Sequence, residues 1–112
     1  MTAFRHPLSD EAVELVARRF RVLGDPTRIR ILERLRDGEA GVKELCAIVG
    51  STQQNVSRHL AVLSDAGIVA RRREGSVVRY RVIDAGVYRL CEEVCGGMER
   101  QAEGLRLALT RD

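Results

Sequence analysis

The sequence predicts one mainly α-helical domain that carries a single small β-hairpin. Apolar residues recur at steps of three and four through most of the chain, which is the spacing of one helix face. Residues 68–82 depart from this spacing, because two strand-like runs flank Glu74-Gly75-Ser76, and a short glycine-containing connection between such runs indicates a hairpin. No linker, repeat or low-complexity segment divides the 112 residues, so we expect one domain over residues 1–112.

The composition is typical of a folded soluble protein, with 45% hydrophobic and 31% charged residues. Only 4% of the residues are aromatic and none is tryptophan, which disfavours stacking on single-stranded bases and favours duplex DNA. There is no charged-then-apolar leader and no long apolar run, so we expect a cytoplasmic protein that does not enter a membrane. The three cysteines should then be reduced thiols, and their odd number argues against a closed disulfide framework.

The first expected helix spans residues 9–23. Ser9 or Asp10 can cap its start, and two acids in its first half suit the positive end of the helix. Gly24 stops it. Its apolar stripe is formed by Ala12, Val13, Val16, Phe20 and Leu23.

A second helix is expected from Pro26 to about Arg36. Asp25 is a good N-cap residue, and proline suits the first helical position. Gly38 terminates the helix. Its packed apolar residues are expected to be Ile29, Ile31, Leu32 and Leu35.

Residues 42–66 are expected to form two short helices joined by a tight polar turn. The first covers residues 42–49 and ends at Gly50, as a glycine just past a helix end commonly does. The next two residues, a serine and a threonine, are N-cap types, which predicts a second helix from about Gln53. The apolar face of this second helix is Val56, Leu60 and Leu63.

This layout is that of a helix-turn-helix, whose second helix lies in the major groove of DNA. Glutamine and asparagine can bond adenine, arginine can bond guanine, and serine can bond a base or a phosphate. We therefore expect DNA contacts from the polar residues at the start and on the outer face of that helix: Gln53, Gln54, Asn55, Ser57, Arg58 and His59. The alternative is an ordinary helical hairpin with a solvated polar face.

The hairpin over residues 68–82 is expected to be a basic wing beside the helix pair. It carries five arginines, which are Arg71, Arg72, Arg73, Arg79 and Arg81. Between Ser51 and Arg81, six arginines against two acids give a net charge of +4, compared with +3 for the whole chain. This local excess of positive charge is typical of a surface that binds phosphates, although a run of charged residues is more often a solvated face.

A last helix is expected over residues 84–109, with Asp84 as its cap. Gly96-Gly97 interrupts it, at roughly 1 kcal/mol per glycine relative to alanine, and favours a kink or fraying there. A partner chain is the natural cover for its single apolar stripe, so we expect a homodimer through residues 9–23 and 84–109. Two recognition helices would then meet successive major grooves of an imperfect palindrome. The stripe consists of Val87, Leu90, Cys91, Val94, Cys95, Met98, Ala102, Leu105 and Leu109.

Three stretches resemble the ArsR/SmtB family. Residues 23–32, LGDPTRIRIL, are similar to its second-helix signature. Residues 54–63, followed by residues 66–69, are similar to its recognition helix, and residues 78–82 to the end of its wing. The resemblance covers roughly residues 10–95. It implies a small homodimeric winged-helix repressor, not an enzyme, that binds operator DNA when unliganded and releases it on binding a metal ion, a metalloid or another signal.

Cys91 and Cys95 are four residues apart, so they share one helix face with Cβ atoms roughly 5–6 Å apart. Two thiolates at that spacing can hold one soft ion, such as trivalent arsenic or antimony, cadmium or lead. A direct disulfide would strain the helix, since it needs Cβ atoms about 4 Å apart. Alternatively both thiols only pack, because free cysteine is among the most buried residue types. Cys46 is expected to pack, and is a third ligand only if the last helix of either chain comes near.

The best-known ligand sets of the family are missing. Its arsenic and cadmium sensors often carry Cys-Val-Cys where this chain has Ala40-Gly41-Val42. Its zinc sensors carry an Asp-x-His pair and a His-x-x-His/Glu pair on the last helix. Here Asp84 aligns, but Gly86, Gly97 and Arg100 take the other places, so zinc is disfavoured.

Other functions remain open from the sequence. The same fold can sense oxidants or reactive sulfur through its cysteines, or carry cysteines that are purely structural. A thiol redox enzyme is disfavoured, because the spacing is CxxxC rather than CxxC and no thioredoxin-like strand pattern precedes it. A sequence-neutral architectural DNA protein would lose little affinity when the operator is scrambled, whereas a repressor should lose several kcal/mol.

Overall fold

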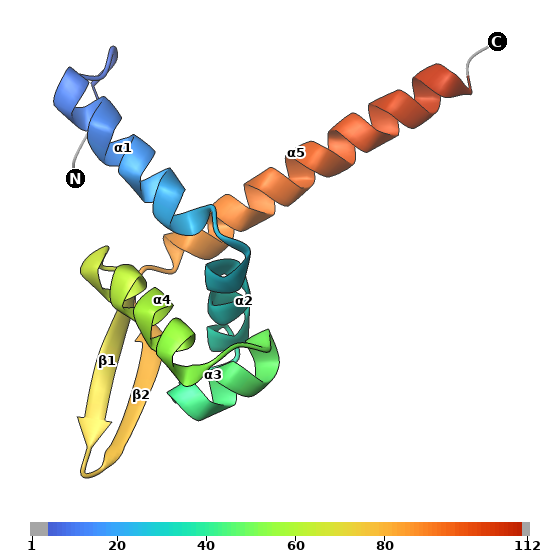
Figure 1. Cartoon of the computed structure of the whole chain (residues 1–112). Helices are drawn as coiled ribbons and strands as arrows, with labels where there is room; N and C mark the ends of the chain where they lie inside the picture. Colours follow the sequence, from blue (N-terminus) through green and yellow to red (C-terminus); the bar gives the residue numbers. More distant parts are fainter. Residues whose placement is uncertain (1–4, 111–112) are drawn as a thin grey trace.

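The computed structural model describes residues 5–110 and confirms the expected fold class, five helices with one antiparallel hairpin (Figure 1). The wing hairpin follows the helix-turn-helix directly, and its register pairs Val69 with Val82 at the base. None of the helices between residues 5 and 110 combines the length and hydropathy of a membrane span. The elements in chain order are α1 (Asp10–Leu23), α2 (Pro26–Leu35), α3 (Val42–Val49), α4 (Gln53–Asp65), β1 (Val69–Glu74), β2 (Val77–Val82) and α5 (Gly86–Leu109).

Side-chain caps fix where three of the helices begin, as the sequence predicted. Each cap is a short polar side chain that accepts a hydrogen bond from a backbone N–H otherwise left without a partner. The Ser9 hydroxyl accepts from Ala12 at 3.1 Å, the Asp25 carboxylate from Arg28 at 3.0 Å, and the Thr52 hydroxyl from Asn55 at 3.1 Å. Gly50 ends α3 in the left-handed conformation, with φ 67°, which glycine adopts without a Cβ penalty.

The hydrophobic core lies among α2, α3, α4 and the base of the hairpin. Its largest fully buried side chains are Ile31 on α2, Leu45 on α3, Val56, Leu60 and Leu63 on α4, and Ile68 in the turn before β1. Of α5, only Val87 in the first turn is buried. The core therefore holds the helix-turn-helix rigid and places α4 at the surface beside the wing.

Ile29 lies outside this core, contrary to the expectation that it packs with the rest of the α2 stripe. Its side chain is 45% exposed. Ile29 is rotated by roughly a third of a turn from the centre of the face that Ile31, Leu32 and Leu35 share. Because Ile29 precedes Leu32 by three residues, the sequence pattern alone groups Ile29 with that face.

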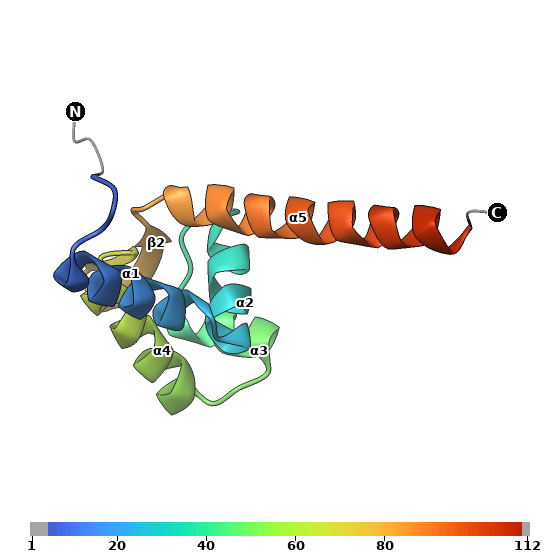
Figure 2. The same cartoon turned by 90° about the horizontal axis from the view of Figure 1, so that it is seen from above.

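The helices α1 and α5 leave most of their apolar residues uncovered. No residue of α1 is buried, and α5 extends away from the rest of the molecule (Figures 1 and 2). The uncovered large side chains include Val13, Leu15, Val16 and Phe20 on α1, and Val94, Met98, Leu105, Leu107 and Leu109 on α5.

The last helix differs in two details from the expectation. It begins at Gly86 rather than Asp84, although the Asp84 carboxylate still accepts a hydrogen bond from the Gly86 N–H at 3.0 Å. It also runs without a break through Gly96 and Gly97, so the predicted kink is absent from α5.

Candidate nucleic-acid interface and cysteine pair

The first turns of α4 present a polar surface that is organised by Asn55. The Asn55 amide nitrogen donates to the Ser51 hydroxyl at 2.7 Å, and its amide oxygen accepts from the Arg58 guanidinium. Thr52, Gln54, Asn55 and Arg58 line a shallow hollow of about 340 Å³. Gln53, Gln54, Ser57 and Arg58 are exposed and Asn55 is half-buried, so these five predicted residues gather at one end of α4.

The expectation that His59 lies on the outer face of α4 is wrong. Its side chain is buried, with 9% of its surface exposed, and its Nδ1 lies 3.0 Å from Nη1 of Arg28. Guanidinium groups only donate, so Nδ1 of His59 accepts this hydrogen bond. The sequence did carry the signal, since His59 lies three residues after Val56 and four before Leu63, at the edge of the core face.

The wing divides its arginines between the two faces of the hairpin. In the register, Arg72 is opposite Arg79 and Arg71 is opposite Tyr80. Because directly opposed residues share a face and neighbours alternate, Arg72, Arg79 and Arg81 lie on one face and Arg71 and Arg73 on the other.

The face with Arg72 and Arg79 is compensated by acidic residues. Arg72 donates to Glu39 with Nη2 at 2.7 Å and Nε at 3.0 Å, and with Nη1 to Glu74 at 2.6 Å. Arg79 lies 3.6 Å from Glu44. The hydrogen bonds from Arg72 hold the pKa of the Glu39 carboxyl below its usual range. In contrast, no ion pair within residues 5–110 involves Arg71, Arg73 or Arg81, which are exposed.

Cys91 and Cys95 lie on α5 just beyond the point where that helix leaves the core. Cys91 is half-buried, Cys95 is exposed, and both are free thiols. One turn before Cys91, the Tyr88 hydroxyl donates to the Leu32 carbonyl at 2.7 Å, and burial raises its pKa. The guanidinium of Arg36 lies 4.5 Å from the Tyr88 ring centroid, within range of a cation–π contact. The base of α5 is therefore fixed on α2, where Arg36 also lies 3.8 Å from Glu92, and no α5 residue after Val87 is buried.

Cys46 does not join this pair in a three-residue cluster within one chain. It lies on α3, half-buried against the hydrophobic core, as the packing interpretation expected. Between residues 5 and 110, no three side chains of histidine, cysteine, aspartate or glutamate come together closely enough to hold a metal ion. Any ligand beyond Cys91 and Cys95 must therefore come from another chain, from solvent or from outside the described residues.

Comparisons with known proteins show that the chain is similar to one family of regulators. The profile of the arsR family of bacterial regulatory proteins matches residues 25–71. The HTH-type transcriptional regulator KmtR of Mycobacterium tuberculosis is 38% identical over 99 residues, which are 88% of this chain and 76% of that protein. A probable mercury resistance operon repressor of Streptomyces lividans is 42% identical over 74 residues, 66% of this chain and 59% of that protein. Among solved structures, a homodimeric winged helix-turn-helix DNA-binding domain from Mycobacterium bovis superposes with a TM-score of 0.71 at 28% identity, covering 88% of this chain and 91% of that one.

Proposed function

Because the chain belongs to the arsR family of bacterial regulatory proteins, we propose that it is a repressor that binds operator DNA as a homodimer and releases it when a thiophilic ion binds Cys91 and Cys95. The first candidates for the ion are trivalent arsenic and antimony, followed by cadmium, lead and other soft metals. Such a regulator acts on the chromosome, and hence in the cytoplasm. The observation that carries the DNA-binding part is the exposed polar end of α4 next to an exposed basic wing.

The DNA-binding surface has two parts with different tasks. Asn55 and Arg58 on α4 have the donors and acceptors that read adenine and guanine in the major groove. Their mutual hydrogen bond holds the guanidinium before DNA arrives, which lowers the ordering cost on binding. The exposed Arg71, Arg73 and Arg81 of the wing would contact phosphates, which position the protein without reading sequence.

The uncovered apolar residues of α1 and α5 support a homodimer. An isolated α5 stripe that includes Met98, Leu105 and Leu109 is costly in water, and a second copy offers a matching surface. The similar domain from Mycobacterium bovis is described as homodimeric. In such a dimer the two α4 helices would face an imperfect palindrome at half-sites about one turn apart.

The thiol pair lies where it can affect this arrangement. Cys91 and Cys95 share the face of α5 that carries Met98 and Leu105, so an ion bound there would sit at the dimer interface. The mercury operon repressor among the relatives supports a soft ion. A ligand releases DNA only if it binds the low-affinity form better. A coupling free energy of about 1–3 kcal/mol between ion binding and DNA binding would weaken operator binding about 5- to 150-fold.

The test is a titration of the reduced protein on a labelled fragment of its own upstream promoter, followed by anisotropy at fixed salt. Arsenite, cadmium and mercuric ions are added in separate titrations. We expect the wild type to release the DNA at low micromolar ion concentration. A Cys91→Ser/Cys95→Ser double variant should not release it. Cys46→Ala is the matched control and should respond like the wild type. Release of the double variant at unchanged concentrations would exclude these two thiols as the ligands.

A second candidate keeps the fold and replaces the ion by an oxidant or reactive sulfur. The free state of both thiols favours it, because free cysteine thiols are the groups that oxidants and reactive sulfur modify. Mass spectrometry after peroxide or polysulfide treatment, read beside DNA binding, separates the two. Release that accompanies a covalent mass change at Cys91 or Cys95, without any response to metal ions, would favour the second candidate.

A further inference from the structure

One guanidinium joins three helices of the fold. Arg19, on α1, donates from Nη1 to the backbone carbonyl of Ala66 and from Nη2 to the carboxylate of Asp84. Ala66 is the C-cap residue of α4, the recognition helix. Asp84 immediately precedes α5, and its second carboxylate oxygen accepts from the Gly86 N–H at 3.0 Å, at the start of that helix. The side chain of Arg19 therefore connects both expected dimerisation helices to the element that would read DNA.

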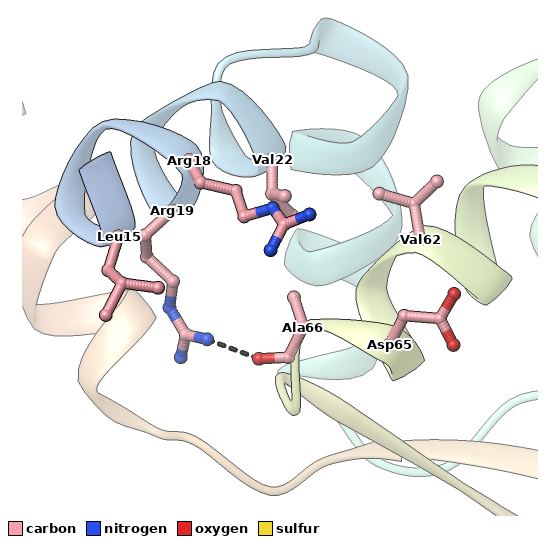
Figure 3. A pocket seen from close by; sticks show the side chains of 7 residues that line it. All are labelled: Leu15, Arg18, Arg19, Val22, Val62, Asp65 and Ala66. Carbon is pink, nitrogen blue, oxygen red and sulfur yellow. Dashed lines mark hydrogen bonds between the residues drawn. The ribbon is translucent and has the colours of Figure 1, made fainter. Parts of the chain in front are cut away.

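Within residues 5–110, the bond from Arg19 to Ala66 is the hydrogen bond that joins α1 to the end of α4. A cavity of about 520 Å³ separates the two helices, and the hydrogen bond from Arg19 to Ala66 crosses its edge (Figure 3). Its walls are formed by Leu15, Arg18, Arg19, Val22, Val62, Asp65 and Ala66. No residue of α1 is buried, although Val22 and Leu23 in its last turn pack against the core. Close packing therefore does not fix the direction of the part of α1 that carries Arg19. The last turn of α1 is held separately, by the hydrogen bond from Arg28 to the Val22 carbonyl at 2.6 Å.

We propose that Arg19 is a positioning residue for operator binding, which sets the orientation of α4 relative to α1 and α5 through Ala66 and Asp84. The proposal rests on the proposed function, because orientation matters only if two copies of α4 must fit two half-sites at once. A shift of α5 caused by a ligand at Cys91 and Cys95 would reach α4 through Asp84 and Arg19. The two contacts of Arg19 form a contiguous physical link between these helices, of the kind that carries energetic coupling between sites.

The contact of Arg19 with Asp84 can be removed alone or together with the contact of Arg19 with Ala66. Asp84→Asn removes the charge that holds Arg19 but keeps an amide oxygen to accept from Gly86, so the start of α5 is preserved. Arg19→Ala removes both contacts. Arg18→Ala is the matched control, because Arg18 lines the same cavity and makes no hydrogen bond or ion pair within residues 5–110.

The deciding measurement compares affinity for an isolated half-site with affinity for the complete operator, using full-length protein without any inducer. We expect Asp84→Asn and Arg19→Ala to bind the half-site like the wild type but to lose about tenfold on the complete operator. They should also tolerate an extra base pair between the half-sites better than the wild type does. Equal losses on both fragments would mean a merely structural role, and unchanged affinity on both would mean no role; either result overturns the proposal.

A second measurement keeps the proposal testable if the chain recognises no operator. Amide hydrogen exchange of the free protein should become faster in residues 62–66 when Asp84 is changed to Asn, with Arg18→Ala unchanged. Faster exchange without operator binding by the wild type would refute the repressor function while supporting the link. Unchanged exchange in residues 62–66 would refute the link whatever the wild type binds.

Discussion

Arg28 and His59 hold α2 and α4 together from inside the protein, with the guanidinium donating to the ring nitrogen across 3.0 Å. The same guanidinium donates to the Val22 carbonyl at the end of α1. His59 therefore contacts α2 from the buried side of α4.

We predict that His59→Ala lowers the free energy of unfolding by about 1–3 kcal/mol, because it leaves a hydrogen bond of Arg28 unmade and a space in the interior. Urea unfolding measures this change. Gln53→Ala, on the exposed start of the same helix, is the control and should stay within about 0.5 kcal/mol of the wild type. A stable His59→Ala protein with weakened base discrimination would instead place His59 at the DNA.

We predict that Arg58→Ala costs about 1–3 kcal/mol of operator affinity and relaxes discrimination at one base pair. Asn55→Ala should cost a similar amount, since it removes a candidate base contact and also frees the Arg58 side chain. Because the two residues touch, the double variant should lose less than the sum of the single losses. Anisotropy on operators with single base changes measures both affinity and discrimination; additive losses would show that the pair acts independently.

The wing arginines should differ in their salt dependence. We predict that Arg73→Ala lowers the slope of log affinity against log salt by about one, as for one lost phosphate contact. Arg72→Ala should change the slope less, since Glu39 and Glu74 already neutralise Arg72. The comparison needs affinities at several salt concentrations for both variants. A larger slope change for Arg72 than for Arg73 would mean that Arg72 contacts phosphate in spite of its ion pairs, which contradicts the prediction.

Local chemistry determines what could be predicted from the sequence. Caps such as Ser9 and Thr52 act within three residues, so the helix starts were recognisable from neighbouring letters. Arg28, the partner of His59, and Glu39, one partner of Arg72, lie 31 and 33 residues away in the sequence, and only folding brings them together. A polar residue at the edge of a helical stripe is ambiguous until such a partner is known, which is why the sequence pattern predicts the wrong face for His59.

The Asp25 cap should make stability depend on pH in the acid range. The backbone N–H of Arg28, and then its charge, hold the pKa of the Asp25 carboxyl below its ordinary value of about 3.9. A carboxyl with a lowered pKa in the folded state contributes stability above the unfolded pKa, and this contribution is lost as the pH falls through the folded value. Asp25→Asn keeps the capping oxygen but not the charge. Its free energy of unfolding should therefore be lower than that of the wild type at pH 7, and this difference should shrink below about pH 4. Unfolding free energies of both proteins across this range test it, and a deficit independent of pH would contradict it.

The uncovered stripe of α5 predicts where a single charge breaks the dimer. Met98 is 57% exposed in the single chain and lies on the face that Cys91, Cys95 and Leu105 share. We predict that Met98→Glu shifts the protein toward monomer, because a carboxylate placed in an apolar interface loses its hydration without gaining a partner. Arg100→Glu introduces the same side chain on the opposite face of the helix and should remain dimeric. Sedimentation over a range of concentrations distinguishes the two variants. If Met98→Glu stays dimeric while Arg100→Glu dissociates, the partner chain covers the other face of α5, and an ion held by Cys91 and Cys95 could not act through the interface.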